Sequence, residues 1–269
     1  MKSISSLQNA QGNTQKKVCS KCGEEIALRR GEHNGITFAY FCRCDYEERM
    51  RAFTEREEAE KKQRVEELFK DARIGRRYHS CTLDSFKQEL NPEAYRAVLR
   101  YVQDIERNVE KGIGLVLCGP VGTGKTHLAV AVLKEAIGAG YSGLFQTAPE
   151  LMYRWNATYS SSGTTEEEFF RTLRDVRFLV IDDLGKGKWS ERVAERLYAV
   201  INARYNELNP TVITTNLVGQ DLRKYVGDAI ADRLYDSCLF IEFKGKSFRV
   251  ARLKGENGNE AGSAPTGKD

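Results

Sequence analysis

One glycine-rich segment, Cys118-Gly-Pro-Val-Gly-Thr-Gly-Lys-Thr-His-Leu128, constrains the fold of this 269-residue chain more than any other feature. It fits the spacing Gly-x-x-x-x-Gly-Lys-[Ser/Thr] and joins an apolar run at 113–118 to a helical pattern. Backbone N–H groups of such a turn can surround a phosphate, and the N-terminus of the following helix adds partial positive charge. The segment therefore predicts a phosphate-binding loop between a buried strand and a helix.

The residues of this loop predict a site for ATP and Mg²⁺. The Lys125 ammonium can reach the β- and γ-phosphate oxygens, and the Thr126 hydroxyl can bind Mg²⁺. The alternative is a glycine turn without a ligand, which is disfavoured because strand, loop and helix all fall where the motif requires them. We expect the other nucleotide contacts from Gly119, Pro120, Val121, Gly122, Thr123, Gly124 and His127.

Polar side chains follow two further strand-like runs. Phe178-Leu-Val-Ile-Asp-Asp-Leu184 ends in two carboxylates, and a strand beside the phosphate loop would place Asp182 near the metal. Asp183 is then the candidate base that orients or activates the attacking water. Asn216 follows the run at 211–215 and is expected to hold that water or the γ-phosphate, although a turn-forming Asn is an equal alternative.

Strand-like and helical patterns alternate through the middle of the chain. Expected strands at 144–147, 178–182 and 211–216 are separated by helical segments that end near 175 and 208. This alternation predicts an α/β fold with a parallel sheet flanked by crossover helices. A further amphipathic helix is expected to begin at Asn91-Pro92 and to carry one apolar face formed by Tyr95, Val98, Leu99, Val102, Ile105 and Val109.

The cysteines indicate a metal site near the N-terminus. The chain has seven, an odd number that speaks against a disulfide framework, and Cys19, Cys22, Cys42 and Cys44 form two close pairs. Four thiolates suit zinc, and so short a segment needs a metal to hold its shape. A redox motif would need a thioredoxin-like unit, and unrelated buried cysteines are the other alternative. His33 lies between the pairs and is expected to be a solvated loop residue.

These patterns divide the chain into four parts. Residues 1–45 are expected to hold a disordered start and the zinc knuckle, and 46–77 a charged, exposed helix that acts as a linker or, alternatively, binds a partner. The ATPase domain is expected at 78–254, followed by a disordered tail at 255–269.

Composition restricts the possible surroundings and partners. No apolar run approaches the roughly 20 residues of a membrane helix, and the N-terminus has no apolar core like that of a secretory signal. We therefore expect a cytoplasmic protein without a membrane partner. The formal net charge of +4 is mild for this length and does not by itself indicate nucleic acid.

The ordered set GPVGTGKT, FLVIDDLG, TVITTN, DAIADRL and GKSFR resembles the AAA+ ATPases of the bacterial replicative helicase-loader family, which also includes the transposition helper ATPases of insertion sequences. The resemblance implies Lys125 and Thr126 as Walker A residues and Asp182 and Asp183 as the Walker B pair. It further implies Asn216 as sensor 1, Arg233 as an arginine finger acting in trans, and Arg249 as sensor 2. Glu is usual at position 183, and the shorter Asp suits a slow switch better than a motor.

The resemblance also implies partners. Such loaders grip the replicative helicase with an N-terminal module, assemble into spirals or rings on single-stranded DNA when ATP-bound, and leave upon hydrolysis. The candidates for DNA contact are Tyr153, Arg154 and Trp155, although an amphipathic helix that buries its aromatic residues is an equal alternative. A transposition helper ATPase is the second functional hypothesis. An adaptor with a vestigial ATP site is disfavoured because no motif is broken.

Overall fold

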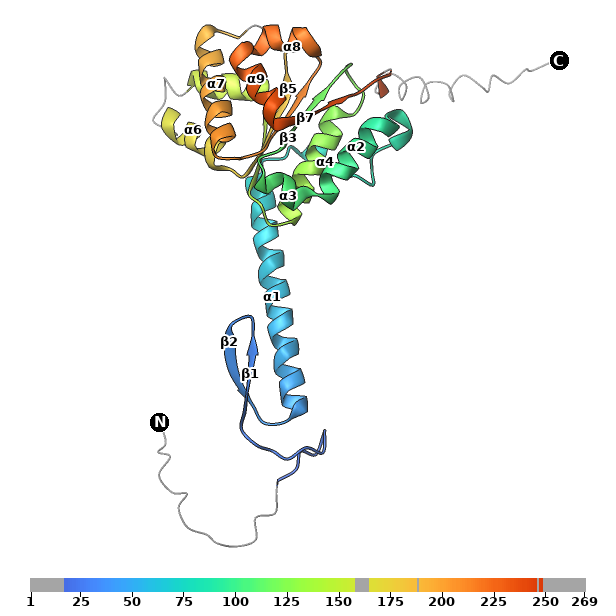
Figure 1. Ribbon diagram of the computed structural model, residues 1–269, viewed down its shortest axis with the longest axis vertical. Helices are drawn as coiled ribbons and strands as arrows, with labels where there is room; N and C mark the ends of the chain where they lie inside the picture. Colours follow the sequence, from blue (N-terminus) through green and yellow to red (C-terminus); the bar gives the residue numbers. More distant parts are fainter. Residues whose placement is uncertain (1–16, 158–164, 188, 246, 249–269) are drawn as a thin grey trace, which may run out of the picture. The chain divides into compact units, whose positions relative to one another are not determined.

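The structure is a computed structural model that describes residues 17–157, 165–187, 189–245 and 247–248 (Figure 1). The chain divides into two units, Met1–Gln63 and Arg64–Asp269. Among the described residues, no helix is both long enough and apolar enough to span a membrane.

The first unit contains a β-hairpin formed by β1 (Arg29–His33) and β2 (Ile36–Tyr40), which pair antiparallel. Asn34 and Gly35 form its turn with φ angles of +46° and +79°, and two successive positive φ angles match the twist of a tight hairpin. The hairpin packs on the chain that follows it, because the Phe38 ring lies 5.8 Å from that of Tyr46 and 5.2 Å from that of Phe53. Aromatic contacts therefore hold this small unit together.

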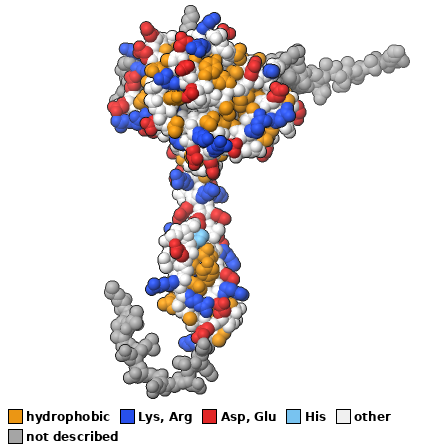
Figure 2. Space-filling view, in the orientation of Figure 1, with side chains coloured by type: hydrophobic (Ala, Val, Ile, Leu, Met, Phe, Trp, Pro, Cys, Tyr) orange, Lys and Arg blue, Asp and Glu red, His pale blue; other side chains and the backbone are white. Residues whose placement is uncertain are grey.

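Helix α1 (Arg43–Asp71) is the exposed, charged helix that was expected at 46–77, and none of its residues is buried. Its charges form ion pairs one turn apart, as between Arg56 and Glu60. Figure 2 shows positive and negative side chains interspersed on this part of the surface. Three apolar residues near its C-terminal end, Val65, Leu68 and Phe69, pack against the core of the second unit, to which they belong.

The second unit is built on a five-stranded parallel sheet with the order β4-β5-β6-β3-β7. This confirms the predicted α/β fold. The edge strand β7 was not among the expected strands, although its segment Cys238-Leu-Phe-Ile241 is an apolar run. The strands are β3 (Gly114–Cys118), β4 (Gly143–Thr147), β5 (Phe178–Leu184), β6 (Thr211–Thr215) and β7 (Cys238–Glu242).

Helices cover both faces of the sheet, and successive strand residues enter opposite cores. Leu115 and Leu117 pack in the core on the α4 side, whereas Val116 and Cys118 pack in the core on the α7 side. The helices are α2 (Pro92–Gln103), α3 (Ile105–Glu110), α4 (Lys125–Gly138), α5 (Ala148–Ala157), α6 (Glu166–Asp175), α7 (Glu191–Asn206), α8 (Gly219–Val226) and α9 (Asp228–Ser237). The 3₁₀ turns η1 (Arg76–Tyr78) and η2 (Gln88–Leu90) precede α2.

The amphipathic helix expected from Asn91 onward is two helices rather than one. Asp104 has φ −106° and ψ +28°, outside the α-helical region, and it ends α2 and begins α3. The apolar face continues across this break, because Val98 and Val109 are both fully buried. Spacing alone predicted the buried face correctly but did not reveal the change of direction at Asp104.

Candidate nucleotide site

The phosphate loop lies between β3 and α4, as the sequence predicts. Gly119 and Gly122 have φ angles of +128° and +79°, which L side chains rarely adopt. A Cβ atom at Gly122 would lie 2.1 Å from Ser247 Oγ, and one at Gly119 would lie 2.2 Å from the carbonyl oxygen of Phe243. Both glycines are therefore required by backbone conformation and by the segment after β7, which crosses the loop.

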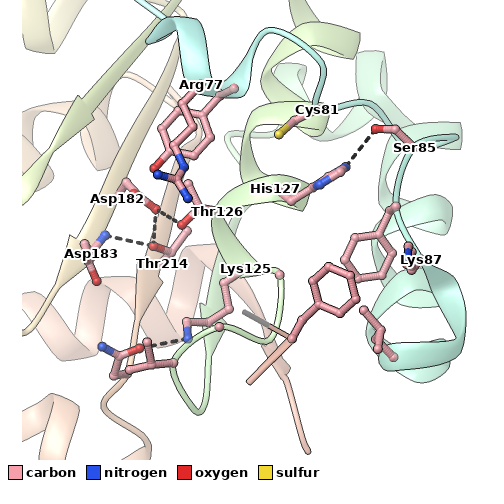
Figure 3. Close-up of a pocket in the computed structure, with 18 of the residues that line it drawn as sticks. Arg77, Cys81, Ser85, Lys87, Lys125, Thr126, His127, Asp182, Asp183 and Thr214 are labelled. Atoms are coloured by element: carbon pink, nitrogen blue, oxygen red, sulfur yellow. Dashed lines mark hydrogen bonds between the residues drawn. The ribbon is translucent and has the colours of Figure 1, made fainter. Parts of the chain in front are cut away.

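Lys125 joins the phosphate loop to the end of strand β6. Its ammonium donates hydrogen bonds to the carbonyl oxygens of Gly119 and Pro120, both at 2.7 Å, and to Asn216 Oδ1 at 2.9 Å (Figure 3). Burial lowers the pKa of Lys125, and the nearby carboxylates of Asp183 and Asp182 oppose that shift. The loop therefore holds a desolvated cation ready for phosphate, with Asn216 beside it as expected.

Asp182 and Thr126 meet at the carboxyl ends of the strands. The Thr126 hydroxyl donates to Asp182 Oδ1 at 2.8 Å, and the Thr214 hydroxyl donates to the same oxygen at 2.6 Å. Burial raises the pKa of Asp182, and these two hydrogen bonds oppose that shift. A hydroxyl and a carboxylate oxygen are the donors that Mg²⁺ prefers, so Thr126 and Asp182 fit the predicted metal site.

Asp183 has an unusual backbone conformation for a residue with a side chain, with φ +65°. Its N–H donates to Thr214 Oγ1 at 2.9 Å, and its carboxylate forms an ion pair with Lys186. Sequence reasoning missed Thr214 and Lys186. Thr214 had a recognisable signal, because it is a polar residue near the carboxyl end of the expected strand Thr-Val-Ile-Thr-Thr.

A cavity of about 300 Å³ extends from the phosphate loop to the segment before α2. His127 Nε2 lies 3.1 Å from Ser85 Oγ and 2.8 Å from the Thr82 carbonyl oxygen, so it fixes this segment against α4. Sequence analysis did not include these lining residues: Arg77, Tyr78, Cys81, Ser85, Phe86, Lys87, Leu90 and Phe248. Together with the phosphate loop and the carboxylates, they complete the lining of the cavity.

Arg233 lies apart from this cavity and is not among its described lining residues. Its guanidinium donates to Asn202 Oδ1 at 2.7 Å and to the Tyr198 hydroxyl at 3.2 Å, and it lies 4.9 Å from the centre of the Tyr198 ring. Helix α7 thus holds an arginine carried by α9. The other expected arginine, Arg249, lies outside the described residues.

The candidate DNA residues differ sharply in exposure. Tyr153 is 75% exposed, whereas Trp155 is 1% exposed and packs edge-on against Phe169. Trp155 is therefore a core residue and not a free stacking surface, which corrects the expectation for that residue. Arg154 is half-buried, with its guanidinium 4.0 Å from the centre of the Phe169 ring. One exposed aromatic residue, Tyr153, is left of the three candidates.

The four N-terminal cysteines come together as predicted. Their sulfur atoms all lie within 4.8 Å of one another, with 3.4 Å between those of Cys19 and Cys44 and 3.2 Å between those of Cys42 and Cys44. A tetrahedral zinc ion with Zn–S bonds of about 2.3 Å separates its sulfurs by about 3.8 Å. The two short spacings lie within about 0.6 Å of that value and no pair is more than 4.8 Å apart, so the four side chains can hold a metal ion after small shifts.

The cysteine sulfurs have unequal proton affinities. Hydrogen bonds from the backbone of Cys22 and Lys21 lower the pKa of Cys19 to about 6, whereas hydrogen bonds with Cys42 and Cys19 raise the pKa of Cys44 to about 12. Crowded thiolates therefore need a cation. His33 is not the solvated loop residue that was expected: it ends β1, and its Nε2 lies 3.0 Å from Glu57 Oε2.

The model of the IstB-like ATP-binding protein family matches residues 37–255. The chain belongs to this family. It is therefore an ATP-binding AAA+ ATPase, and its IstB-like match includes the phosphate loop, both carboxylates, Asn216 and Arg233. The match begins within the N-terminal hairpin, so it also includes Cys42 and Cys44.

Similar proteins come from two functional groups. The chain is 27% identical over 243 residues to the replicative helicase loader DnaC of Escherichia coli K12, which covers 89% of this chain and 91% of that protein. It is 30% identical over 174 residues to the insertion sequence IS5376 putative ATP-binding protein of Geobacillus stearothermophilus, covering 63% and 68%. A crystal structure of the DnaC helicase loader superposes with a TM-score of 0.57 at 30% identity, covering 63% of this chain and all of that one.

Proposed function

We propose that this IstB-like ATPase is a loader that binds the replicative DNA helicase and deposits it on single-stranded DNA, with ATP hydrolysis as the release switch. The extent of the similarity to the E. coli loader carries this proposal. That match covers 89% of the chain, more than the residues of the second unit could supply on their own. The similarity therefore includes part of the N-terminal unit, where a loader needs its partner-binding surface.

In this proposal the two units have separate tasks. The four cysteines hold zinc, which fixes the N-terminal unit in the form that grips the helicase. The second unit binds ATP and Mg²⁺ through Lys125, Thr126 and Asp182, while Asp183 and Asn216 position the attacking water. The short Asp183 side chain, already paired with Lys186, suits slow turnover.

Assembly would complete the ATP site. Arg233 does not line the cavity of its own chain, and α7 holds its guanidinium in place. An arginine supplied by the next subunit stabilises charge in the transition state of phosphoryl transfer. ATP-bound subunits would then form a spiral or ring in which hydrolysis depends on the neighbour, with Arg249 as sensor 2 and Tyr153 as an exposed stacking surface for DNA.

A second candidate is a transposition helper ATPase that binds target DNA and a transposase. The family match and the 30% identity to the insertion-sequence protein favour it. That protein, however, matches 63% of this chain, which the second unit could supply alone. The match to the E. coli loader therefore requires residues of the N-terminal unit, whereas the match to this insertion-sequence protein does not.

The test is capture of the host's replicative helicase by the full-length, zinc-loaded protein. The loader proposal predicts capture that is lost in Cys42→Ser and kept in Cys238→Ser, because Cys238 lies outside the sulfur cluster. Capture of a neighbouring transposase in place of the helicase would support the second candidate. Helicase capture that does not change upon removal of the metal would contradict a zinc-dependent grip.

A further inference from the structure

We propose that Arg77 contacts the β- and γ-phosphate oxygens of bound ATP within its own subunit. Neither the phosphate-loop motif nor the arginines expected from the family resemblance include it. The inference rests on the ATP site described above and adds to it a triphosphate-sensing residue from the segment before α2. Arg77 lies on the 3₁₀ turn η1, shortly after α1 in the chain.

The position of Arg77 is the first observation. Its side chain lines the same cavity as Thr126 and Asp182, and Figure 3 shows it pointing toward these two residues. Thr126 and Asp182 fit the Mg²⁺ site, and in phosphoryl transfer the metal bridges β- and γ-phosphate oxygens. A cation on this side of the cavity therefore faces the outer phosphates rather than the base.

The second observation is that the Arg77 side chain has no interaction partner among the described residues. Among the described cationic residues that line the cavity, Lys125 binds loop carbonyls, Lys186 pairs with Asp183, and Lys87 lies over the Phe248 ring. Arg77 is exposed, and the structure gives it no hydrogen bond, ion pair or ring contact among the described residues. A guanidinium can bind phosphate oxygens with two parallel hydrogen bonds, which a lysine cannot.

The third observation is that the backbone beneath Arg77 is held in place. The Tyr78 ring lies 5.6 Å from that of Phe145 on β4, and Lys134 on α4 donates to the His79 carbonyl oxygen at 2.6 Å. The Phe145 N–H donates to the Ala72 carbonyl oxygen at 2.8 Å. Contacts on both sides of η1 therefore fix the turn to the sheet and to α4, so that the arginine is presented from a rigid base.

The experiment compares Arg77→Ala with Arg76→Ala in the full-length protein. Arg76 is exposed on the same turn but does not line the cavity, so its removal controls for general loss of positive charge. Titration calorimetry with Mg²⁺ would measure the Kd for a non-hydrolysable ATP analogue and for ADP. We expect Arg77→Ala to weaken triphosphate binding about tenfold or more and ADP binding much less, and Arg76→Ala to change both less than about twofold.

Further variants and outcomes decide the proposal. Arg77→Lys should recover part of the triphosphate affinity, because lysine keeps the positive charge but cannot form the two parallel hydrogen bonds of a guanidinium. Equal losses for ATP and ADP, an unchanged Kd in Arg77→Ala, or the same loss in Arg76→Ala would each overturn the assignment. Lys125→Ala measured in parallel tests the ATP site itself: its failure to weaken ATP binding would refute that site, whereas an effect confined to Lys125 would refute only the role of Arg77.

Discussion

The sulfur cluster and the nucleotide site are built in opposite ways. In the first unit, Cys42 is the one fully buried side chain among the described residues, so the unit has almost no core of its own. The nucleotide site instead stands on β3 and β6, which are buried along their entire length. A unit without a core depends on its ligand for shape, whereas a site on a packed sheet is formed before its ligand arrives.

The largest effect that this comparison predicts is on Cys42→Ser. Removing one of four thiolates should release the metal and leave the hairpin without its main constraint, because aromatic contacts alone stabilise so small a unit poorly. We expect zinc content to fall to background and amide hydrogen exchange to rise throughout residues 17–63. ATP affinity should stay within about twofold of the wild-type value, since the second unit has its own core.

If the metal stays bound in Cys42→Ser, the first unit does not depend on all four thiolates. If ATP affinity falls together with the zinc content, the two units are not independent. The matched control is Cys238→Ser, which alters a cysteine on β7 and should leave the metal in place.

The converse change is Lys125→Ala in the nucleotide site. It removes a cation that would bind the β- and γ-phosphates, and charged hydrogen bonds of this kind are each worth about 1.5–3 kcal/mol. We expect ATP affinity to fall about a hundredfold or more, with zinc content unchanged and the sheet intact by circular dichroism. Lys224→Ala, an exposed lysine on α8, is the control and should bind ATP normally.

The same contrast explains what the sequence could and could not predict. The phosphate loop, Asp182 and Asn216 were predictable because each follows a strand-like run, and parallel strands bring their carboxyl ends together. Arg77 was missed because its importance comes from the residues that lie beside it in space, which spacing along the chain does not encode. Thr214 stood in a recognisable position near the end of a strand, but its hydrogen bond to Asp182 joins residues that are 32 positions apart in the chain.

Two other differences have local causes. Strand β7 begins directly after α9 ends at Ser237, so no turn residue in the sequence marks its apolar run as a separate strand. The sequence left open whether Trp155 contacts DNA or is buried in an amphipathic helix, and its position on α5 turns it into the core with Phe169. Helical phase, rather than composition, decided that Tyr153 is exposed and Trp155 is buried.

The carboxylate of Asp182, the proposed Mg²⁺ ligand, allows a further test of the nucleotide site. Burial raises the pKa of Asp182, so its ionised form is less favourable in the folded chain than in the unfolded one. That penalty is present above the raised pKa and disappears as the pH falls below the ordinary value for Asp. Asp182→Asn should therefore abolish ATP turnover yet stabilise the nucleotide-free protein at pH 7, because Asn Oδ1 can still accept both threonine hydrogen bonds.

Urea unfolding at several pH values measures this effect. Asp182→Asn should be more stable than the wild type at pH 7, and this gain in the free energy of unfolding should shrink as the medium becomes acidic. A stability gain that does not depend on pH, or a loss of stability at pH 7, would contradict the prediction. Either result would show that the ionised carboxylate of Asp182 does not destabilise the folded protein through its burial.

The smallest predicted effect concerns the way α7 holds Arg233. Tyr198→Phe keeps the ring beneath the guanidinium but removes the hydroxyl that accepts its hydrogen bond at 3.2 Å. Losing one such hydrogen bond costs about 0.5–1.5 kcal/mol, so we expect kcat to fall about threefold. KM should change little, because an arginine finger acting in trans stabilises the transition state rather than bound ATP. Tyr205→Phe is the matched control: its hydroxyl donates to Asp236 rather than contacting Arg233, and its loss should leave kcat unchanged. The Tyr198→Phe protein should regain turnover when it is mixed with Lys125→Ala subunits, because these subunits keep Tyr198 and can supply a correctly held Arg233 to the neighbouring ATP site. If turnover does not recover, Tyr198 acts within its own subunit, and Arg233 is not held in place for a neighbour.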